Sequence, residues 1–240
     1  MTEVRVVRSE DFGQECLRAL LEAIGKVPSP VVGLPTGDTP VALFEAVKAA
    51  AEAGELDISA WRPFAIDEYG GPGEHACSNR AFFRRRWDVI PGAPPVEQFD
   101  PEAPDIDAEC ARVATALEKA GGLTVALLGV GMNGHLAFNE PGSSPESSLR
   151  RVELHNASRE SARPCFGDAA PTWGLTLGLR ELLGARRVVV MANGPAKAAI
   201  VASALDGPET PARPESFARG EHVTWVLDVA SAAGLRGPSG

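Results

Sequence analysis

Residues 123–130 (LTVALLGV) form an almost unbroken apolar segment. An apolar run of this length, without polar alternation, predicts a strand buried on both faces, as in parallel sheets that are covered by helices. Shorter apolar segments predict further strands at 31–34, 63–66, 188–191 and 223–227. The chain therefore has the spaced, buried strands that are typical of an α/β protein.

Segments with helical spacing lie between these strands. One apolar helix face is expected from the i, i+4 spacing of Phe12, Cys16, Leu20 and Ile24. Ser9 is a candidate cap for this helix. Further helices are expected at about 40–53, 78–87, 106–117 and directly after 194–195. The alternation predicts a three-layer α/β fold of modified Rossmann-like type, with a mainly parallel sheet and helices on both faces.

The length of 240 residues fits a single catalytic α/β domain spanning 1–240. Hydrophobic residues make up 44% of the chain, which is enough for a packed core. Residues 234–240 are rich in Gly, Pro and Ser, so we expect them to form a flexible tail.

Charge and cysteine content restrict the partners and the compartment. The formal net charge of −9 disfavours nucleic acid and anionic membranes as partners. The sequence shows no apolar leader segment and no apolar run of about 18 residues, so we expect a cytoplasmic protein. Reduced thiols, rather than metal ligands, are expected for the scattered Cys16, Cys77, Cys110 and Cys165.

Four loops that follow predicted strands carry polar residues and glycines. These loops span 35–39, 67–70, 131–142 and 193–197. In open parallel sheets, ligands bind beyond the carboxyl ends of the strands, near a change in strand order. The clustering of such residues at one rim predicts an enzyme with a small-molecule site there.

The first and fourth loops are candidates for phosphate binding. Thr36, Gly37, Asp38 and Thr39 precede a helix, whose free N–H groups and positive dipole end favour an anion. The loop lacks the GxxxxGK[ST] pattern of nucleoside triphosphate sites, and an ordinary capped turn is the alternative. Lys197 lies in the first turn of a predicted helix, where a bound phosphate would offset its unfavourable interaction with the dipole. A solvated lysine is the alternative there.

Asp67 ends an apolar strand in the segment FAIDEY. Partial desolvation at a strand end raises the pKa of a carboxyl group and makes it a candidate general base. The alternative is that Asp67 only caps the following turn.

The loop 129–142 (GVGMNGHLAFNEPG) begins with a GxGxxG pattern after a strand. In a dinucleotide site this pattern opens a helix, but Pro141, Gly142 and Pro145 prevent a helix of useful length here. A long irregular loop in a compact domain is usually functional.

His135 and Glu140 in this loop form a possible proton-transfer pair, since a carboxylate favours a protonated imidazole and fixes its ring. Gly131 and Gly134 would allow the backbone to approach a ligand closely. The alternative for His135 is a surface or supporting residue.

The three segments GLPTGDTP (33–40), FAIDEY (64–69) and GHLAFNEPG (134–142) together resemble one known family. It is the superfamily of glucosamine-6-phosphate isomerase (deaminase) and 6-phosphogluconolactonase, and the resemblance spans about 31–226. The Asn-Glu-Pro triplet resembles the signature of the amino-sugar branch of this superfamily, whereas lactonases typically lack it.

The resemblance implies a role for each matching position. Asp67 would be the base that moves a proton between C2 and C1, and His135, held by Glu140, would open the sugar ring. The 6-phosphate would be held by Gly37, Asp38, Thr39 and Lys197. Arg163 or Arg159 would supply a further cation. The substrate would be a sugar phosphate, no metal or organic cofactor would be needed, and the chain would be a monomer or a small homo-oligomer.

Asn133 departs from the pattern of the glucosamine enzymes, in which an aspartate usually stands at this position. A neutral amide can orient the imidazole but cannot stabilise its charged form by charge. An asparagine at position 133 resembles the galactosamine-6-phosphate members of the family, so the sequence leaves open which sugar epimer is the substrate. Two other functions also stay open: a 6-phosphogluconolactonase with His135 as general base, and a sugar-phosphate sensor without catalysis.

Overall fold

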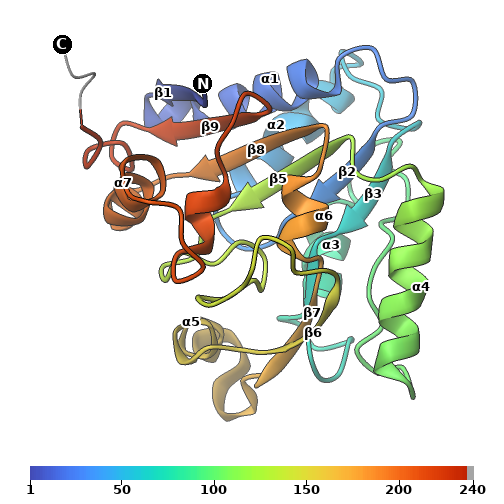
Figure 1. Ribbon diagram of the computed structural model, residues 1–240. Helices are drawn as coiled ribbons and strands as arrows, with labels where there is room; N and C mark the ends of the chain where they lie inside the picture. The colour runs from blue at the N-terminus through green and yellow to red at the C-terminus, as the bar shows by residue number, and fades with distance from the viewer. Residues whose placement is uncertain (237–240) are drawn as a thin grey trace.

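The computed structural model describes residues 1–236 and contains two sheets. The larger sheet has six parallel strands in the order β1-β9-β8-β5-β2-β3 (Figure 1). Its strands are β1 (Glu3–Val7), β2 (Val31–Leu34), β3 (Arg62–Ala65), β5 (Val125–Gly129), β8 (Arg187–Ala192) and β9 (Val223–Asp228). The predicted α/β fold with a mainly parallel sheet is confirmed.

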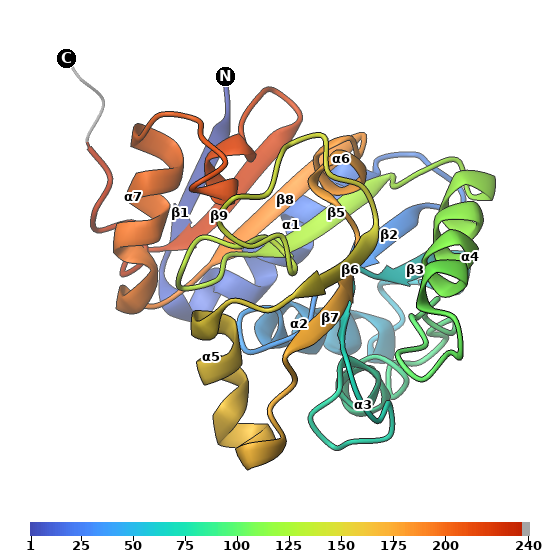
Figure 2. The same cartoon turned by 60° about the horizontal axis from the view of Figure 1, so that its bottom comes forward.

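Helices cover both faces of this sheet (Figures 1 and 2). One face carries α1 (Phe12–Ile24) and α2 (Val41–Glu52), and the other carries α4 (Ile106–Lys119), α6 (Leu179–Leu183) and α7 (Ala198–Asp206). This division follows from right-handed crossovers, because the chain moves along the sheet in one direction up to β3 and in the opposite direction from β5 to β9. Helix α3 (Asn79–Arg86) packs against α2.

The second sheet is antiparallel and has the strand order β4-β7-β6. Its strands are β4 (Asp67–Tyr69), β6 (Arg150–Glu153) and β7 (Trp173–Thr176). Helix α5 (Asn156–Phe166) connects β6 to β7 and lies on the same side of the molecule as the small sheet (Figure 2). The sequence patterns did not predict this sheet, because its strands are short and two of them contain charged residues.

Short 3-10 turns complete the structure, and one of them changes a predicted cap. They are η1 (Ser9–Asp11), η2 (Gly167–Ala169), η3 (Pro195–Lys197) and η4 (Pro214–Phe217). Ser9 lies in η1 and does not cap α1; its hydroxyl donates to Asp228 at 2.9 Å instead. The predicted apolar face of α1 is confirmed, since all four of its residues are buried.

The core lies between the large sheet and its helices. In β5, Val125, Ala126, Leu127 and Leu128 are fully buried, as expected for a central strand covered on both faces. Among the described residues, no helix has both the length and the apolar character needed to cross a bilayer.

The predicted tail, 234–240, lies partly outside the described residues, which end at 236. Leu235 packs against the core, and the Arg236 N–H donates to Asp206 at 3.1 Å. Residues 234–236 therefore contact the domain, contrary to the expectation of a flexible tail for that part.

Candidate active site

A cavity of about 230 Å³ lies at the carboxyl ends of the parallel strands. Its walls come from the loops that follow β2, β3, β5 and β8. The change in strand order lies between β2 and β5, so this is the position where such sheets bind ligands. The predicted site residues that line the cavity are Thr36, Gly37, Asp38, Thr39, Asp67, Gly131, His135 and Lys197.

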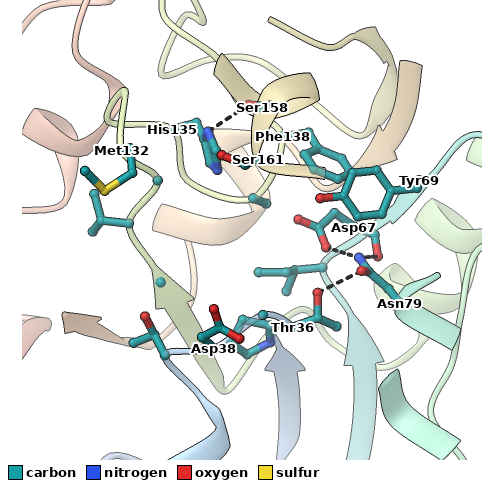
Figure 3. A pocket seen from close by; sticks show the side chains of 18 of the residues that line it. Thr36, Asp38, Asp67, Tyr69, Asn79, Met132, His135, Phe138, Ser158 and Ser161 are labelled. Atoms are coloured by element: carbon teal, nitrogen blue, oxygen red, sulfur yellow. Dashed lines mark hydrogen bonds between the residues drawn. The ribbon is translucent and has the colours of Figure 1, made fainter. Parts of the chain in front are cut away.

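Asp67 stands where the chain leaves the parallel sheet and enters the antiparallel one. The carbonyl of Ile66 accepts a hydrogen bond from the N–H of Leu177, and the N–H of Ile66 donates to the carbonyl of Leu34. Asp67 is the first residue of β4. Its side chain is 8% exposed and faces the cavity (Figure 3). The crossing between sheets therefore presents a nearly buried carboxyl group to a ligand.

Two neighbours set the state of Asp67. Asn79, the first residue of α3, donates from Nδ2 to Asp67 Oδ1 at 2.7 Å and to the Asp67 carbonyl at 3.0 Å. Burial raises the pKa of Asp67 to about 8; the negative charge of Glu68 adds to this rise and the bond from Asn79 opposes it. A carboxyl group with a pKa near neutrality can accept and return a proton, as a general base must.

Glu68 lies behind Asp67 and is held by backbone groups. Its carboxylate accepts hydrogen bonds from the N–H groups of Tyr69, Asn79 and Arg80, at 2.8 to 2.9 Å. Burial nevertheless raises its pKa. Glu68 therefore fixes the start of α3, and with it the position of Asn79 beside Asp67.

The loop after β2 forms the opposite end of the cavity. Asp38 and Thr39 line it just before α2, and Gly37 has a φ of +94°, a conformation that favours glycine. Thr36 is tied to the Asp67 group, because its hydroxyl donates to Asn79 Oδ1 at 2.8 Å (Figure 3). This loop thus connects the predicted phosphate end to the predicted base.

Lys197 closes this end of the cavity from the opposite side. Its Nζ donates to the carbonyl of Val130 at 2.6 Å, and burial lowers its pKa while the charge of Asp38 opposes that effect. Among residues 1–236, Lys197 is the only lysine or arginine that lines the cavity. It supplies the local positive charge that an anionic substrate needs on a protein of net charge −9.

His135 lies on another wall of the cavity than Asp67 (Figure 3). Its Nδ1 is 3.1 Å from Ser158 Oγ and 3.6 Å from Glu140 Oε2. A Cβ added at Gly131 would come within 2.3 to 2.4 Å of the imidazole ring, so the ring rests on this glycine. Gly131 therefore makes room for His135 at the edge of the cavity.

Glu140 and Asn133 stand behind His135 and do not line the cavity. Asn133 Nδ2 donates to Glu140 Oε2 at 2.8 Å, and the His135 backbone N–H donates to Asn133 Oδ1 at 3.3 Å. Burial alone would raise the pKa of Glu140, but its interactions with His135, Ser158 and Asn133 lower it to about 2. Glu140 is thus an ionised group that lies 3.6 Å from the imidazole.

Two predicted residues take other positions. Gly134 has a φ of +87° and packs on the buried Glu215 rather than lining the cavity. Arg163 is exposed near the end of α5 and pairs with Glu160 at 3.3 Å, and Arg159 is also exposed. Neither arginine lines the cavity, so the expected phosphate contact of Arg163 is not present in this structure.

The sequence patterns did not single out several residues that line the cavity. Tyr69 and Phe138 lie within the strand-end loops, whereas Asn79 comes from α3 and Ser158 and Ser161 come from α5. The ring of Tyr69 packs against Phe138 with centroids 4.9 Å apart, and burial strongly raises its pKa, so it stays neutral. Tyr69 is the only tyrosine of the chain and directly follows the Asp-Glu pair, which was a usable signal. No sequence pattern pointed to Ser158 or Ser161.

Cys77 and Cys165 form a disulfide, contrary to the expectation of four reduced thiols. Folding brings these residues together, with Cα atoms 5.9 Å apart, although they are 88 positions apart in the sequence. The bond joins the segment before α3 to the end of α5, so it spans two elements that line the cavity. Cys16 and Cys110 are free.

Residues 1–236 contain no cluster of three or more His, Cys, Asp or Glu side chains arranged to hold a metal ion. The titratable side chains of the cavity instead include the carboxyl groups of Asp67 and Asp38, the imidazole of His135 and the amine of Lys197. This set can transfer protons and bind an anion.

Known proteins are similar to this chain in both sequence and fold. A sequence profile of glucosamine-6-phosphate isomerases/6-phosphogluconolactonase matches residues 7–226. The glucosamine-6-phosphate deaminase of Beutenbergia cavernae is 36% identical over 231 residues, which cover 92% of this chain and 87% of the relative. That of Mycolicibacterium smegmatis is 37% identical over 234 residues, covering 94% and 89%.

Two solved structures are also similar. A monomeric glucosamine-6-phosphate deaminase aligns with a TM-score of 0.92 at 27% identity, over 97% of this chain and 100% of its own. The 6-phosphogluconolactonase of Trypanosoma brucei aligns with a TM-score of 0.75 at 24% identity, over 98% and 99%, which shows a shared fold. With the profile covering most of its length, the chain belongs to the glucosamine-6-phosphate isomerase/6-phosphogluconolactonase family.

Proposed function

We propose that this chain converts glucosamine 6-phosphate and water to a ketohexose 6-phosphate and ammonia, as an isomerase-type deaminase. One observation carries the proposal: Asp67, His135 and Lys197, which are far apart in the sequence, line one cavity. The names of the relatives support the amino sugar as substrate.

Each group has a step that fits its position. Protonated His135 gives its proton to the ring oxygen, the C1–O5 bond breaks, and the proton of the C1 hydroxyl passes to water, which yields the open-chain aldehyde. Ionised Asp67 then takes the proton from C2 while water returns a proton to the C1 oxygen, which leaves an enolamine. Asp67 returns its proton at C1, and the C2–N bond becomes a protonated imine. The resulting imine at C2 is attacked by water, and the C2–N bond breaks to release ammonia.

The other cavity residues bind and orient the substrate. Lys197 and the N–H groups of the loop 36–39 hold the 6-phosphate at the beginning of α2, where the helix dipole favours an anion. Glu140 stands behind His135, with Oε2 3.6 Å from Nδ1, and Asn133 holds Glu140 through its amide. The same residues support binding in a monomer, because one chain lines the whole cavity.

An ammonia-release assay tests this proposal. We expect turnover of glucosamine 6-phosphate by the wild type, and a fall of about 10²–10⁴-fold in kcat for Asp67→Asn, the range typical of losing a general base. Binding of the substrate to the Asp67→Asn variant, measured by calorimetry, should persist. Asp57→Asn, an exposed carboxylate away from the cavity, is the matched control.

The same assay decides the epimer. We expect galactosamine 6-phosphate to react more slowly, and a tenfold difference corresponds to about 1.4 kcal/mol in transition-state binding. Hydrolysis of a 6-phosphogluconolactone with no ammonia released from either amino sugar would instead identify a lactonase. Tight binding of both sugars without turnover would identify a sensor.

We also propose that the enzyme works in the cytoplasm. Its substrate carries a phosphate, which is costly to move across a bilayer, so it must be used in the compartment where it is made. No nucleic acid or membrane partner is part of this proposal.

A further inference from the structure

Atom Nδ1 of the His135 imidazole has one side-chain partner within hydrogen-bond distance. Ser158 Oγ lies 3.1 Å from Nδ1, whereas the nearest oxygen of Glu140 is 3.6 Å away. The first distance is that of a hydrogen bond, and the second exceeds the usual range of about 2.7–3.2 Å. Ser158, on α5, therefore holds the ring.

Ser158 Oγ and a carboxylate oxygen of Glu140 both lie on the Nδ1 side of the ring, and this fixes the direction of the bond between Ser158 and His135. The pKa of Glu140 is lowered to about 2, so its carboxylate is ionised and can only accept. A proton on Nδ1, next to this carboxylate, is therefore favoured, and Ser158 Oγ accepts a hydrogen bond from the N–H at Nδ1 of His135. In the neutral ring, the proton then resides on Nδ1 and Nε2 is left unprotonated.

Asn133 does not hold the imidazole ring of His135. Its amide nitrogen donates to Glu140, and its oxygen accepts from the backbone of His135, so neither end reaches the ring. The residue that departs from the glucosamine pattern thus supports the carboxylate, and the orientation of the ring depends on Ser158.

We propose that Ser158 is the positioning residue that fixes the tautomer and orientation of His135, so that the placement of α5 controls the ring-opening acid. The inference rests on the proposed function of His135. Ser158 is 3% exposed and comes from an element that follows the signature loop in the sequence. A shift of α5 would remove the hydroxyl from His135 without moving the loop 131–142.

The tautomer can be measured without any turnover. Nitrogen-15 NMR of the imidazoles in the wild type, with the His135 signals assigned from a His135→Gln variant, should show the proton on Nδ1 in the neutral form. The chain has only four histidines, so the spectrum is tractable. In Ser158→Ala we expect this preference to be lost. An unchanged tautomer in that variant would refute the proposal, whether or not the wild type releases ammonia.

Kinetics give the second readout. We expect Ser158→Ala to lower kcat by at least about tenfold, less than loss of the whole acid–base group, with little change in KM and a shifted pH profile. Ser158→Thr keeps the hydroxyl and should restore both. Ser29→Ala removes a hydroxyl that donates to the carbonyl of Ala60, away from the cavity, and should leave the pH profile unshifted.

Two outcomes separate the causes of failure. Ser158→Ala with the kcat and pH profile of the wild type would overturn the role of Ser158 while leaving the proposed function intact. A wild type that releases no ammonia would overturn the proposed function, and the NMR measurement would still decide the role of Ser158. Alanine is a good helix former, so the variant should fold, which circular dichroism checks.

Discussion

Asp67 is buried, but its proposed role requires the ionised carboxylate. Ionisation of Asp67 should therefore lower the stability of the folded protein. The pKa of Asp67 is about 8 in the folded protein against 3.8 for a free side chain. The folded state therefore binds this proton more tightly than the unfolded state, and the stabilisation that this gives is full below pH 4 and is lost as pH rises through 8. Asp67 can be ionised in the folded protein only because other interactions compensate for this loss of folding stability.

This predicts a pH-dependent gain in stability for Asp67→Asn. The free energy of unfolding of the variant minus that of the wild type should grow from about pH 4 to about pH 8 and then level off, because asparagine does not titrate. Urea unfolding at several pH values measures the difference, in which the other titrating groups cancel. A difference that is independent of pH would contradict the raised pKa.

Two glycines of the signature loop should respond in opposite ways to alanine. At Gly131 the added Cβ meets only the imidazole of His135, an adjustable side chain, and the backbone does not have a positive φ. We expect Gly131→Ala to change stability by less than about 1 kcal/mol but to lower kcat by about 10²-fold, the cost of a misplaced catalytic group.

At Gly134 the φ of +87° strains any other residue, and the added Cβ meets the buried Glu215. Gly134→Ala should therefore lose at least about 1–2 kcal/mol of stability. Thermal melting and ammonia release for both variants test the pair. Equal losses of stability would contradict the assignment of Gly131 to the site and Gly134 to the support of the loop.

At the scale of elements, α5 connects catalysis to the disulfide. The helix carries Ser158 to His135, and its far end is tied through Cys165 to Cys77, just before the helix that bears Asn79. The bond thus joins the elements that hold the proposed acid, His135, and the proposed base, Asp67. A loop of 88 residues closed by a disulfide gains about 4.6 kcal/mol in the chain-entropy model.

Reduction should therefore destabilise the protein and release α5. We expect a reductant to lower the midpoint of urea unfolding and to lower kcat. The double variant Cys77→Ser/Cys165→Ser should show both effects and be insensitive to reductant. Burial raises the pKa of the free Cys16 and Cys110, so neither thiol should interfere. A wild type that keeps its kcat on full reduction would show that α5 holds its position without the bond.

The elements also show how far sequence patterns reach. Strands β2, β5, β8 and β9 and helices α2, α3 and α4 were predicted within a few residues, because each has its own apolar period or cap. Strands β4 and β6 were missed, since three or four residues with charged side chains carry no period. Helix α5 was missed because its first turns are polar and Pro164 lies within it.

The same division applies to the site. Asp67, His135 and Lys197 were predicted because they follow strands, and strand ends of a parallel sheet converge without further information. Asn79, Ser158 and the disulfide were not, because they reach the cavity through the packing of α3 and α5, which no local pattern encodes. The supporting residues of the site therefore depend on tertiary structure, whereas the reacting residues depend on topology.

At the scale of the whole molecule, the site is complete within one chain. The sheet brings four loops to one cavity, and α3 and α5 add the residues that hold the base and the acid. The local charge of Lys197 and the beginning of α2 offset a net charge of −9 at the phosphate end.

We therefore expect the activity per chain to be independent of protein concentration. Ammonia release per chain should stay constant from micromolar to nanomolar protein, because dilution would separate any oligomer but cannot remove a residue that the chain itself supplies. Sedimentation velocity over the same range would report whether an oligomer is present at all. Activity that falls on dilution and returns on concentration would show that contact between copies is needed to hold α5 or the loops in place, even though one chain lines the cavity.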